Sequence, residues 1–220
     1  RRARHRSAGW SGAWPAPPRP GPRLRRGLPV ALPSTSPSCA EKAENDLVRV
    51  LQSAKNRPSP IDGYFGAVYY IGPIFTAFRG TPEASQFYSL LRQEIDERVR
   101  LGKGPITPDG EMGEEKYRLV TEGPPNWTSF RDFWKMFYDE GAVVVVSTYS
   151  KVGGLYDFGF RHDADRPLES LADYCLGCYT NLNLPSRIDM ICKYIDEYQA
   201  DGRLINSIKS CNSFSAGQLL

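Results

Sequence analysis

The chain has 220 residues, of which 40% are hydrophobic and 12% aromatic, a composition typical of one medium-sized folded domain or slightly more. No stretch approaches the run of about 18 apolar residues that a transmembrane helix needs. Residues 1–38 contain eight of the 28 basic residues, all arginines, and no acidic residue. The rest of the chain has 20 basic and 25 acidic side chains, so it is mildly acidic. The net charge of +3 comes from the first 38 residues and is therefore no sign of nucleic-acid binding.

Residues 1–38 are predicted to form a disordered tail. They hold eight prolines and no Phe, Tyr, Ile or Met, so they cannot bury enough apolar surface to order themselves. An arginine-rich, acid-free segment is typical of a transit peptide, but prolines break the amphipathic helix that such peptides form. All of its residue types have GC-rich codons, which favours the interpretation that it is a translation artefact from outside the gene's reading frame.

Residues 39–115 are predicted to form a helical and irregular linking region. One helix is expected over 41–56, and an aromatic, glycine-rich segment without a clean period follows it. Thr81 and Pro82 suit the N-cap and first position of a second helix, which ends near Gly102.

Residues 116–220 alternate between strand and helix patterns. This order predicts a doubly wound, Rossmann-like α/β domain with right-handed crossovers. Four consecutive valines are typical of a strand buried on both faces, so we expect the second strand to be the central one. The domain looks incomplete, because the sequence ends about two turns into a helix, and we expect a truncated gene product. The strands are predicted at Tyr117–Glu122, Ala142–Ser147 and 204–208, and the helices at 129–141, 168–180 and 185–200.

The five cysteines are an odd number, and no secretory segment precedes them. Both facts favour a reducing, cytoplasmic location over a disulfide-stapled secreted domain. Cys211 follows the third predicted strand, at the sheet edge where doubly wound folds bind ligands, and helix-forming residues follow it. A helix N-terminus favours the thiolate that a metal or iron–sulfur cluster needs. The alternative is a small buried residue at a tight turn.

The remaining cysteines give weaker patterns. Cys175 and Cys178 form a lone CxxC without a second pair at metal spacing, so we expect them to be structural or merely adjacent to a site. Cys192 falls on a helical apolar stripe and is predicted to be a core residue, together with Ile188, Ile191 and Ile195.

Two loops follow strands at the same predicted sheet edge. Asn126 and Trp127 come after the first strand, and Tyr149 and Lys151 come after the second. We expect these four residues to line a site, with loop packing as the alternative. His162 stands between Arg161 and Asp163, a context more typical of a solvated surface residue than of a proton donor. Glycine-containing segments elsewhere lack the spacing of a phosphate-binding loop.

Five long segments carry a family resemblance over about residues 40–220. They are NRPSPIDGYFGAVYYIGPIFTAFRGT, MGEEKYRLVTEGPPNW, YSKVGGLYDFGFRHD, DYCLGCYTNLNLP and NSIKSCNSFSAGQLL. Together they resemble catalytic subunits of the 2-hydroxyacyl-CoA dehydratase family, on its benzoyl-CoA reductase branch. The resemblance implies two Rossmann-like domains, a homologous second catalytic subunit, and separate ATP-hydrolysing activator subunits that inject a low-potential electron.

The resemblance also implies a [4Fe–4S] cluster held by three cysteines. KSCNSFS matches the family's ligand motif of the C-terminal domain, so Cys211 is the expected ligand. Ser210, Asn212 and Ser213 flank it and either donate hydrogen bonds to cluster sulfur or cap the helix. The other two ligands belong to an N-terminal domain that this chain lacks, so we expect the chain alone to be inactive.

The implied function is the reduction of the aromatic ring of benzoyl-CoA to a cyclic dienoyl-CoA in single-electron steps. Two alternatives stay open at this point. One is a 2-hydroxyacyl-CoA dehydratase subunit, which works through a ketyl radical. The other is a non-catalytic Rossmann-like remnant that binds a partner subunit or a CoA ester.

Overall fold

The computed structural model describes residues 37–65, 80–107, 110–111, 114–149, 158–163, 165–208 and 210–215. All of these residues belong to one compact unit, Ser34–Leu220. Apart from its last two residues, which begin a helix, the predicted tail lies outside the described residues. The predicted domain boundaries stay a prediction. Within the described ranges, no helix is both long and apolar enough to cross a membrane.

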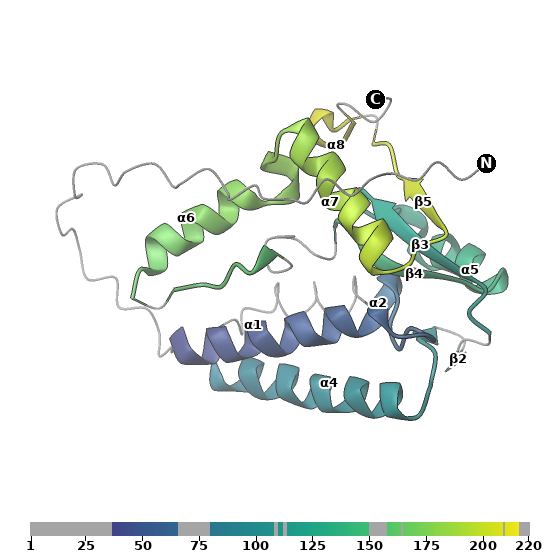
Figure 1. Ribbon diagram of the computed structural model, residues 1–220, viewed down its shortest axis with the longest axis horizontal. Helices are drawn as coiled ribbons and strands as arrows, with labels where there is room; N and C mark the ends of the chain where they lie inside the picture. Colours follow the sequence, from purple (N-terminus) through teal and green to yellow (C-terminus); the bar gives the residue numbers. More distant parts are fainter. Residues whose placement is uncertain are drawn as a thin grey trace. The chain divides into compact units, whose positions relative to one another are not determined.

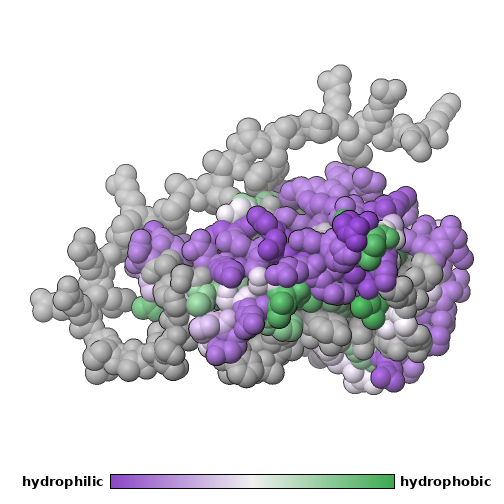
Figure 2. Space-filling model, turned by 90° about the horizontal axis from the view of Figure 1, so that it is seen from below, coloured by the Kyte–Doolittle hydropathy of each residue, from purple (hydrophilic) through white to green (hydrophobic). Residues whose placement is uncertain are grey.

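Two long helices, α1 (Pro37–Gln52) and α4 (Pro82–Arg100), lie side by side (Figure 1). As predicted, Thr81 caps α4: its hydroxyl accepts a hydrogen bond from the backbone N–H of Ala84 at 3.2 Å. A seam of Ala43, Leu47 and Tyr88 joins the two helices. The side of the molecule that α4 covers is mainly hydrophilic (Figure 2).

A parallel sheet forms the centre of the domain, in the order β4 (Ala142–Ser147), β3 (Tyr117–Glu122), β5 (Gly202–Ile205). The parallel arrangement and the incomplete α/β class are confirmed. The prediction that Ala142–Ser147 is central is wrong, because β3 lies between the other two described strands. β4 is nevertheless buried along its whole length: Val143, Val145 and Val146 belong to the main core cluster, and the chain at Gly63 lies against Val144 and Trp134. The valine run therefore indicated burial on both faces but not the order of the described strands.

Helices cover both faces of the sheet (Figure 1). The first crossover, from β3 to β4, contains α5, and the second, from β4 to β5, contains α7. The other described elements are short or lie away from the sheet. The bounds of the two crossover helices and of these other elements are η1 (Ser53–Lys55), α2 (Gly63–Phe65), β1 (Ile106–Thr107), β2 (Gly110–Glu111), η3 (Trp127–Ser129), α5 (Phe130–Asp139), α6 (Pro167–Gly177), η5 (Tyr179–Asn181), α7 (Leu184–Glu197) and α8 (Asn212–Ser215).

The inward face of α7 differs from the predicted one. Cys192 is exposed and Ile188 is 43% exposed, so the prediction that they are core residues is wrong. The helix is turned so that Tyr194 and, just beyond its end, Tyr198 fill the core against the sheet. Each aromatic ring buries more apolar surface than an isoleucine or a cysteine would, which accounts for the turn. The buried residues of α7 are Arg187, Met190, Ile191 and Tyr194.

Arg118 fastens the amino-terminal end of the sheet to the surrounding helices. It is fully buried, and its guanidinium donates to the carbonyl oxygens of Ala54 at 2.6 Å, Tyr198 at 2.8 Å and Asn56 at 3.1 Å. It also pairs with the buried carboxylate of Glu115. These contacts join the end of α1, the end of α7 and β3, at the edge opposite to the strands' carboxyl ends, so we assign Arg118 a structural role.

Candidate functional site

The carboxyl ends of the three parallel strands meet at one edge of the sheet. The chain runs from β3 outward to β4, and then returns past β3 to β5. The winding direction therefore reverses between β3 and β5. Open α/β sheets bind ligands in the crevice beyond such a reversal, so this edge is the candidate functional site.

A turn at Gly123 ties the three strand ends together. Its φ of +91° and its distance to Asn206, whose carbonyl oxygen would lie 2.7 Å from an added Cβ, both require glycine. The Gly123 N–H donates to the hydroxyl of Thr148 at 3.1 Å, and the Asn206 N–H donates to the Glu122 carbonyl at 2.9 Å. The Asn206 amide also donates to the carbonyl of Pro124. The loops after all three strands are thus fixed relative to one another.

A buried polar cluster of Glu122, Tyr179 and Arg187 lies directly at this edge. One carboxylate oxygen of Glu122 accepts from the Tyr179 hydroxyl at 3.0 Å and from Arg187 Nη2 at 3.2 Å. The guanidinium of Arg187 lies 4.7 Å from the centre of the Tyr179 ring. Burial raises the pKa of Tyr179 to about 12, even though its hydrogen bond with Arg187 acts in the opposite direction. Tyr179 therefore stays a hydrogen-bond donor at neutral pH.

Sequence patterns did not reveal this buried cluster. A glutamate that ends a buried strand signals that a partner is needed, because a buried carboxylate is costly unless it is paired. The partners lie 57 and 65 residues further along the chain, in η5 and α7. No local pattern identifies partners at such separations.

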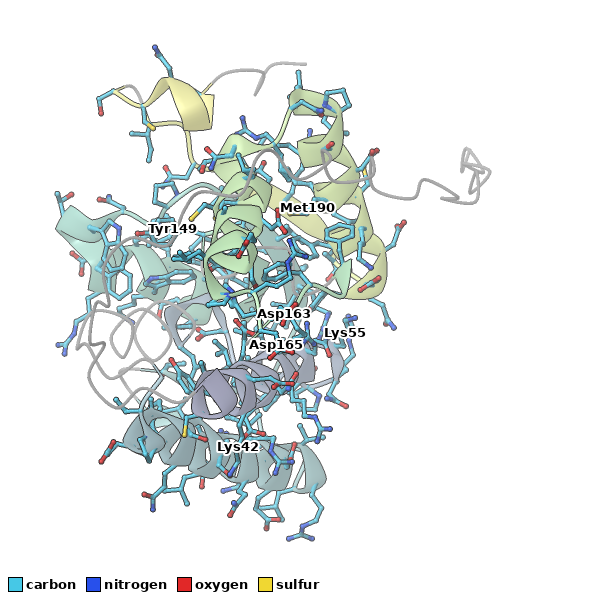
Figure 3. The ribbon with its side chains drawn as sticks, turned by 90° about the vertical axis from the view of Figure 1, so that its left-hand side faces the viewer. Lys42, Lys55, Tyr149, Asp163, Asp165 and Met190 are labelled. Carbon is cyan, nitrogen blue, oxygen red and sulfur yellow. The ribbon has the colours of Figure 1, made fainter. Side chains whose placement is uncertain are left out.

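The structure brings two of the predicted site-lining residues together. The rings of Trp127 and Tyr149 meet edge to face at 6.0 Å, and Trp127 also stacks on Phe130 at 4.9 Å. Trp127 is 49% exposed, whereas Tyr149 is half-buried against the seam between α1 and α4. Tyr149 follows β4 at the carboxyl ends of the strands, whereas Lys55 of η1 lies near their amino-terminal ends. The two residues accordingly appear on opposite sides of Figure 3.

The other two site-lining predictions have different outcomes. Asn126 is exposed, and its side-chain oxygen accepts a hydrogen bond from the Thr128 hydroxyl at 2.7 Å. Lys151 lies outside the described residues. The described part of the edge is therefore an aromatic surface with a polar rim.

Cys211 stands in a compact turn near the same edge. β5 ends at Ile205, so residues 206–210 separate the strand from Cys211, which the sequence analysis had expected to follow the strand directly. The Cys211 N–H donates to the carbonyl of Ile208 at 3.1 Å, and Ser215 returns to the Cys211 carbonyl through its N–H and its hydroxyl, at 3.0 and 2.9 Å. α8 packs on η5, which carries Tyr179, so the turn lies beside the buried cluster (Figure 1).

Cys211 directly precedes α8, as the sequence pattern predicted, and the described part of that helix is one turn, Asn212–Ser215. Cys211 itself is half-buried, and its neighbours Ser210 and Asn212 are exposed. The side chain of Ser213 lies outside the described residues.

The CxxC pair differs in exposure. Cys175 is exposed, while Cys178 is half-buried and its thiol donates to the Tyr174 carbonyl at 3.4 Å. Burial, and to a smaller extent the neighbouring Cys175, raises the pKa of the Cys178 thiol. Burial thus favours the protonated form of the Cys178 thiol more than that of a freely exposed one.

A metal site cannot be completed within the described ranges. No three His, Cys, Asp or Glu side chains there are grouped so that they could hold a metal ion. Cys211 fits the role of one thiolate ligand by type and by place. A [4Fe–4S] cluster at this position needs its other ligands from outside the described residues.

His162 is not the solvated surface residue that its neighbours in sequence indicated. Its Nε2 lies 3.3 Å from a carboxylate oxygen of Glu44, and its Nδ1 lies 3.3 Å from the Ser170 hydroxyl. Its ring contacts those of Phe160 and Tyr174. The histidine thus joins α1 to the start of α6. Sequence neighbours did not reveal this, since Glu44 is remote in the chain.

Comparison with known proteins identifies relatives much longer than this chain. It is 76% identical over 179 residues to the B subunit of benzoyl-CoA reductase from Thauera aromatica, which covers 81% of this chain and 41% of the relative. It is 28% identical over 166 residues to the (R)-2-hydroxyisocaproyl-CoA dehydratase alpha subunit of Clostridioides difficile, which covers 74% of this chain and 36% of the relative. The chain thus spans 41% or less of the length of these relatives.

A family model agrees with these relatives. The model for 2-hydroxyglutaryl-CoA dehydratase, D-component, matches residues 38–220, which is most of the chain and includes the whole candidate site. The fold, the relatives and this match lead to one conclusion. The chain belongs to the 2-hydroxyglutaryl-CoA dehydratase D-component family.

Proposed function

We propose that the chain is part of a catalytic subunit of the benzoyl-CoA reductase type, which reduces the aromatic ring of benzoyl-CoA to a cyclic dienoyl-CoA. The observation that carries this proposal is the 76% identity to the B subunit of a benzoyl-CoA reductase, against 28% to a dehydratase alpha subunit. The difference favours reduction of an aromatic ring over dehydration of a 2-hydroxyacyl-CoA. Because the chain spans only part of such a subunit, the activity belongs to the assembled enzyme.

Cys211 is proposed as one ligand of a [4Fe–4S] cluster whose other thiolates lie outside the described residues. When bound, such a cluster supplies single electrons at low potential. The support is the place of Cys211 at the sheet edge where the winding reverses, in a turn held by Ser215. Ser210 and Asn212, both exposed beside it, are suited to donate hydrogen bonds to cluster sulfur. Ser213 shares this proposed role.

The aromatic surface of Trp127 and Tyr149 is proposed to line the acyl-CoA site. Two rings that meet edge to face offer an apolar wall, and an aromatic acyl group packs well on such a wall. Asn126 is exposed next to them and can donate to a carbonyl oxygen. Lys151 is included in this proposal on its sequence position alone.

The partners in this proposal are a homologous second catalytic subunit and separate activator subunits that hydrolyse ATP. The relatives bear the names of single subunits, one a B subunit and the other an alpha subunit, which supports an assembly. A cytoplasmic location is proposed with it, because a low-potential cluster and five unpaired cysteines suit a reducing compartment.

An anaerobic assay of the assembled enzyme tests the proposed reaction. The assembly, with its activator, ATP and a strong reductant, should convert benzoyl-CoA to a dienoyl-CoA whose mass is two hydrogens greater. The same preparation should leave 2-hydroxyacyl-CoA substrates unchanged. Loss of water from a 2-hydroxyacyl-CoA, with benzoyl-CoA untouched, would favour the dehydratase instead. No reaction with either, despite bound cluster, would favour a binding role.

A further inference from the structure

The two cysteines of the CxxC meet at the joint between α6 and η5. Cys175 lies in the last turn of α6, and Cys178 stands between the end of α6 and the start of η5. The Cys178 N–H donates to the Cys175 carbonyl at 3.4 Å, a bond between residues three apart that closes a turn. Of the five cysteines in the chain, no other two are so near each other in sequence.

This turn brings the two residues within the span of a disulfide. A turn closed in this way holds the Cα atoms of its first and last residues within about 7 Å, and disulfides span about 4.4–6.8 Å. The two thiols also interact electrostatically, since Cys175 contributes to the raised pKa of Cys178. Cys178 has left the helical backbone path, with a ψ of 141°, so its side chain can rotate towards Cys175 once its thiol releases the Tyr174 carbonyl.

The thiols of Cys175 and Cys178 differ in their access to solvent, and this difference sets the order in which they react. Cys175 is exposed, so a small reagent reaches it directly. Cys178 is half-buried at the base of the same turn. An exposed cysteine that reacts first, next to a second cysteine that resolves the product, is the arrangement of a redox-active pair.

We propose that Cys175 and Cys178 form a reversible disulfide by exchange with a small-molecule disulfide such as oxidised glutathione. The thiolate of Cys175 attacks one sulfur of the small disulfide, so that a mixed disulfide forms and one small thiol leaves. The thiolate of Cys178 then attacks the Cys175 sulfur and expels the second small thiol. The protein pair gives up two electrons and two protons, and the small disulfide takes up both. Because burial favours the protonated Cys178 thiol, the second step should be the slower one.

A disulfide here fastens the start of the segment that carries Tyr179. Asn181 already ties the same joint, since its N–H donates to the Cys178 carbonyl at 2.8 Å and its side-chain amide donates to the Cys175 carbonyl at 2.6 Å. η5 also packs on α8, and its Tyr179 hydroxyl donates to the buried Glu122. A covalent bond across the joint therefore restrains a segment beside the candidate site. The inference goes beyond the proposed function and does not depend on it, because it uses only thiols of this chain.

Mass spectrometry of the chain after incubation with oxidised glutathione tests the pair. In the wild type, the peptide that contains both cysteines should lose two hydrogens and carry no glutathione. Cys178→Ser lacks the resolving thiol and should instead keep one glutathione on Cys175. Cys192 is the internal control: it is exposed on α7, has no cysteine near it in sequence, and should keep glutathione in both proteins.

Two results of this experiment would overturn the proposal. One is glutathione held by Cys175 to the same extent in the wild type and in Cys178→Ser, because Cys178 would then not resolve the mixed disulfide. The other is a wild type in which neither cysteine of the pair reacts. In a time course, the mixed disulfide at Cys175 should appear before the intramolecular bond, and dithiothreitol should restore both thiols. A bond from Cys175 to any cysteine other than Cys178 would refute the pairing.

A second preparation distinguishes a redox pair from a pair of metal ligands. In a full-length subunit purified without oxygen and with its cluster bound, oxidised glutathione should still convert Cys175 and Cys178 to the disulfide. Protection of both thiols by the cluster would make them ligands and refute the redox pair, while the proposed ring reduction would stand. Hydrogen exchange at the Asn181 amide should slow several-fold in the oxidised chain. Equal or faster exchange would contradict the fastening of the joint.

Discussion

Replacing Arg118 by methionine should destabilise the domain more than any surface change. Methionine keeps much of the side chain's volume but removes the donors to the carbonyls of Ala54, Asn56 and Tyr198. It also leaves the buried Glu115 carboxylate without its closest cation, although Arg57 remains 3.6 Å away. Breaking a buried ion pair on one side costs about 3–5 kcal/mol. We therefore expect a loss of about 4 kcal/mol, a large part of the roughly 5–15 kcal/mol of an ordinary domain.

Urea unfolding followed by circular dichroism measures this loss. Arg203→Met is the matched control, because Arg203 is exposed on β5, and it should change the free energy of unfolding by less than about 0.5 kcal/mol. Adding Glu115→Gln to Arg118→Met should restore part of the loss, since it removes the uncompensated charge. A loss below about 1 kcal/mol in Arg118→Met would refute the assignment of Arg118 as the fastening point of the sheet.

Three further predictions concern the strand-end edge and the CxxC. Gly123 and Gly102 both have a positive φ, +91° and +63°, so alanine should cost about 1–3 kcal/mol at each in urea unfolding. Gly123→Ala should cost more than Gly102→Ala, because its added Cβ would lie 2.7 Å from a carbonyl oxygen, whereas Gly102 has open space around it. One tyrosine should titrate near pH 12 by ultraviolet absorbance, and this signal should vanish in Tyr179→Phe. Because the raised pKa of Tyr179 favours the neutral phenol in the folded state, stability should fall as pH rises from about 10 towards 12, and less so in Tyr179→Phe. Iodoacetamide should label Cys175 faster than Cys178, whose pKa is raised by burial; equal rates by mass spectrometry would contradict that environment.

Local patterns predicted the elements of the fold well. Capping chemistry predicted the cap at Thr81. Periodicity predicted the alternation of strands and helices, including the strands at Tyr117–Glu122 and Ala142–Ser147. The order of the strands in the sheet could not be predicted from these patterns, because a run of valines indicates only that both faces of a strand are covered. At β4 that cover comes from the chain at Gly63 beside Val144 and from the main core cluster around Val143, Val145 and Val146.

Long-range partners set the limit of the sequence analysis at the candidate site. Trp127 and Tyr149 were found because both follow strands in a parallel sheet. Arg187 and Tyr179 were missed because their reason for being buried is Glu122, which lies far away in the chain. The face of α7 was misjudged for a related reason: hydrophobicity alone ranks Ile188 and Cys192 above the tyrosines that fill the core.

The iron and acid-labile sulfide content of Cys211→Ala tests the central claim most directly. The assembly should be purified without oxygen from a subunit that spans the full length of its relatives, together with the second catalytic subunit. If Cys211 is a cluster ligand, Cys211→Ala should lose most of the iron and sulfide of this subunit's cluster, while Cys192→Ala, changed at an exposed position on α7, should retain them. Full cluster content in Cys211→Ala, with loss in Cys175→Ala, would contradict the assignment and make the CxxC the ligand pair.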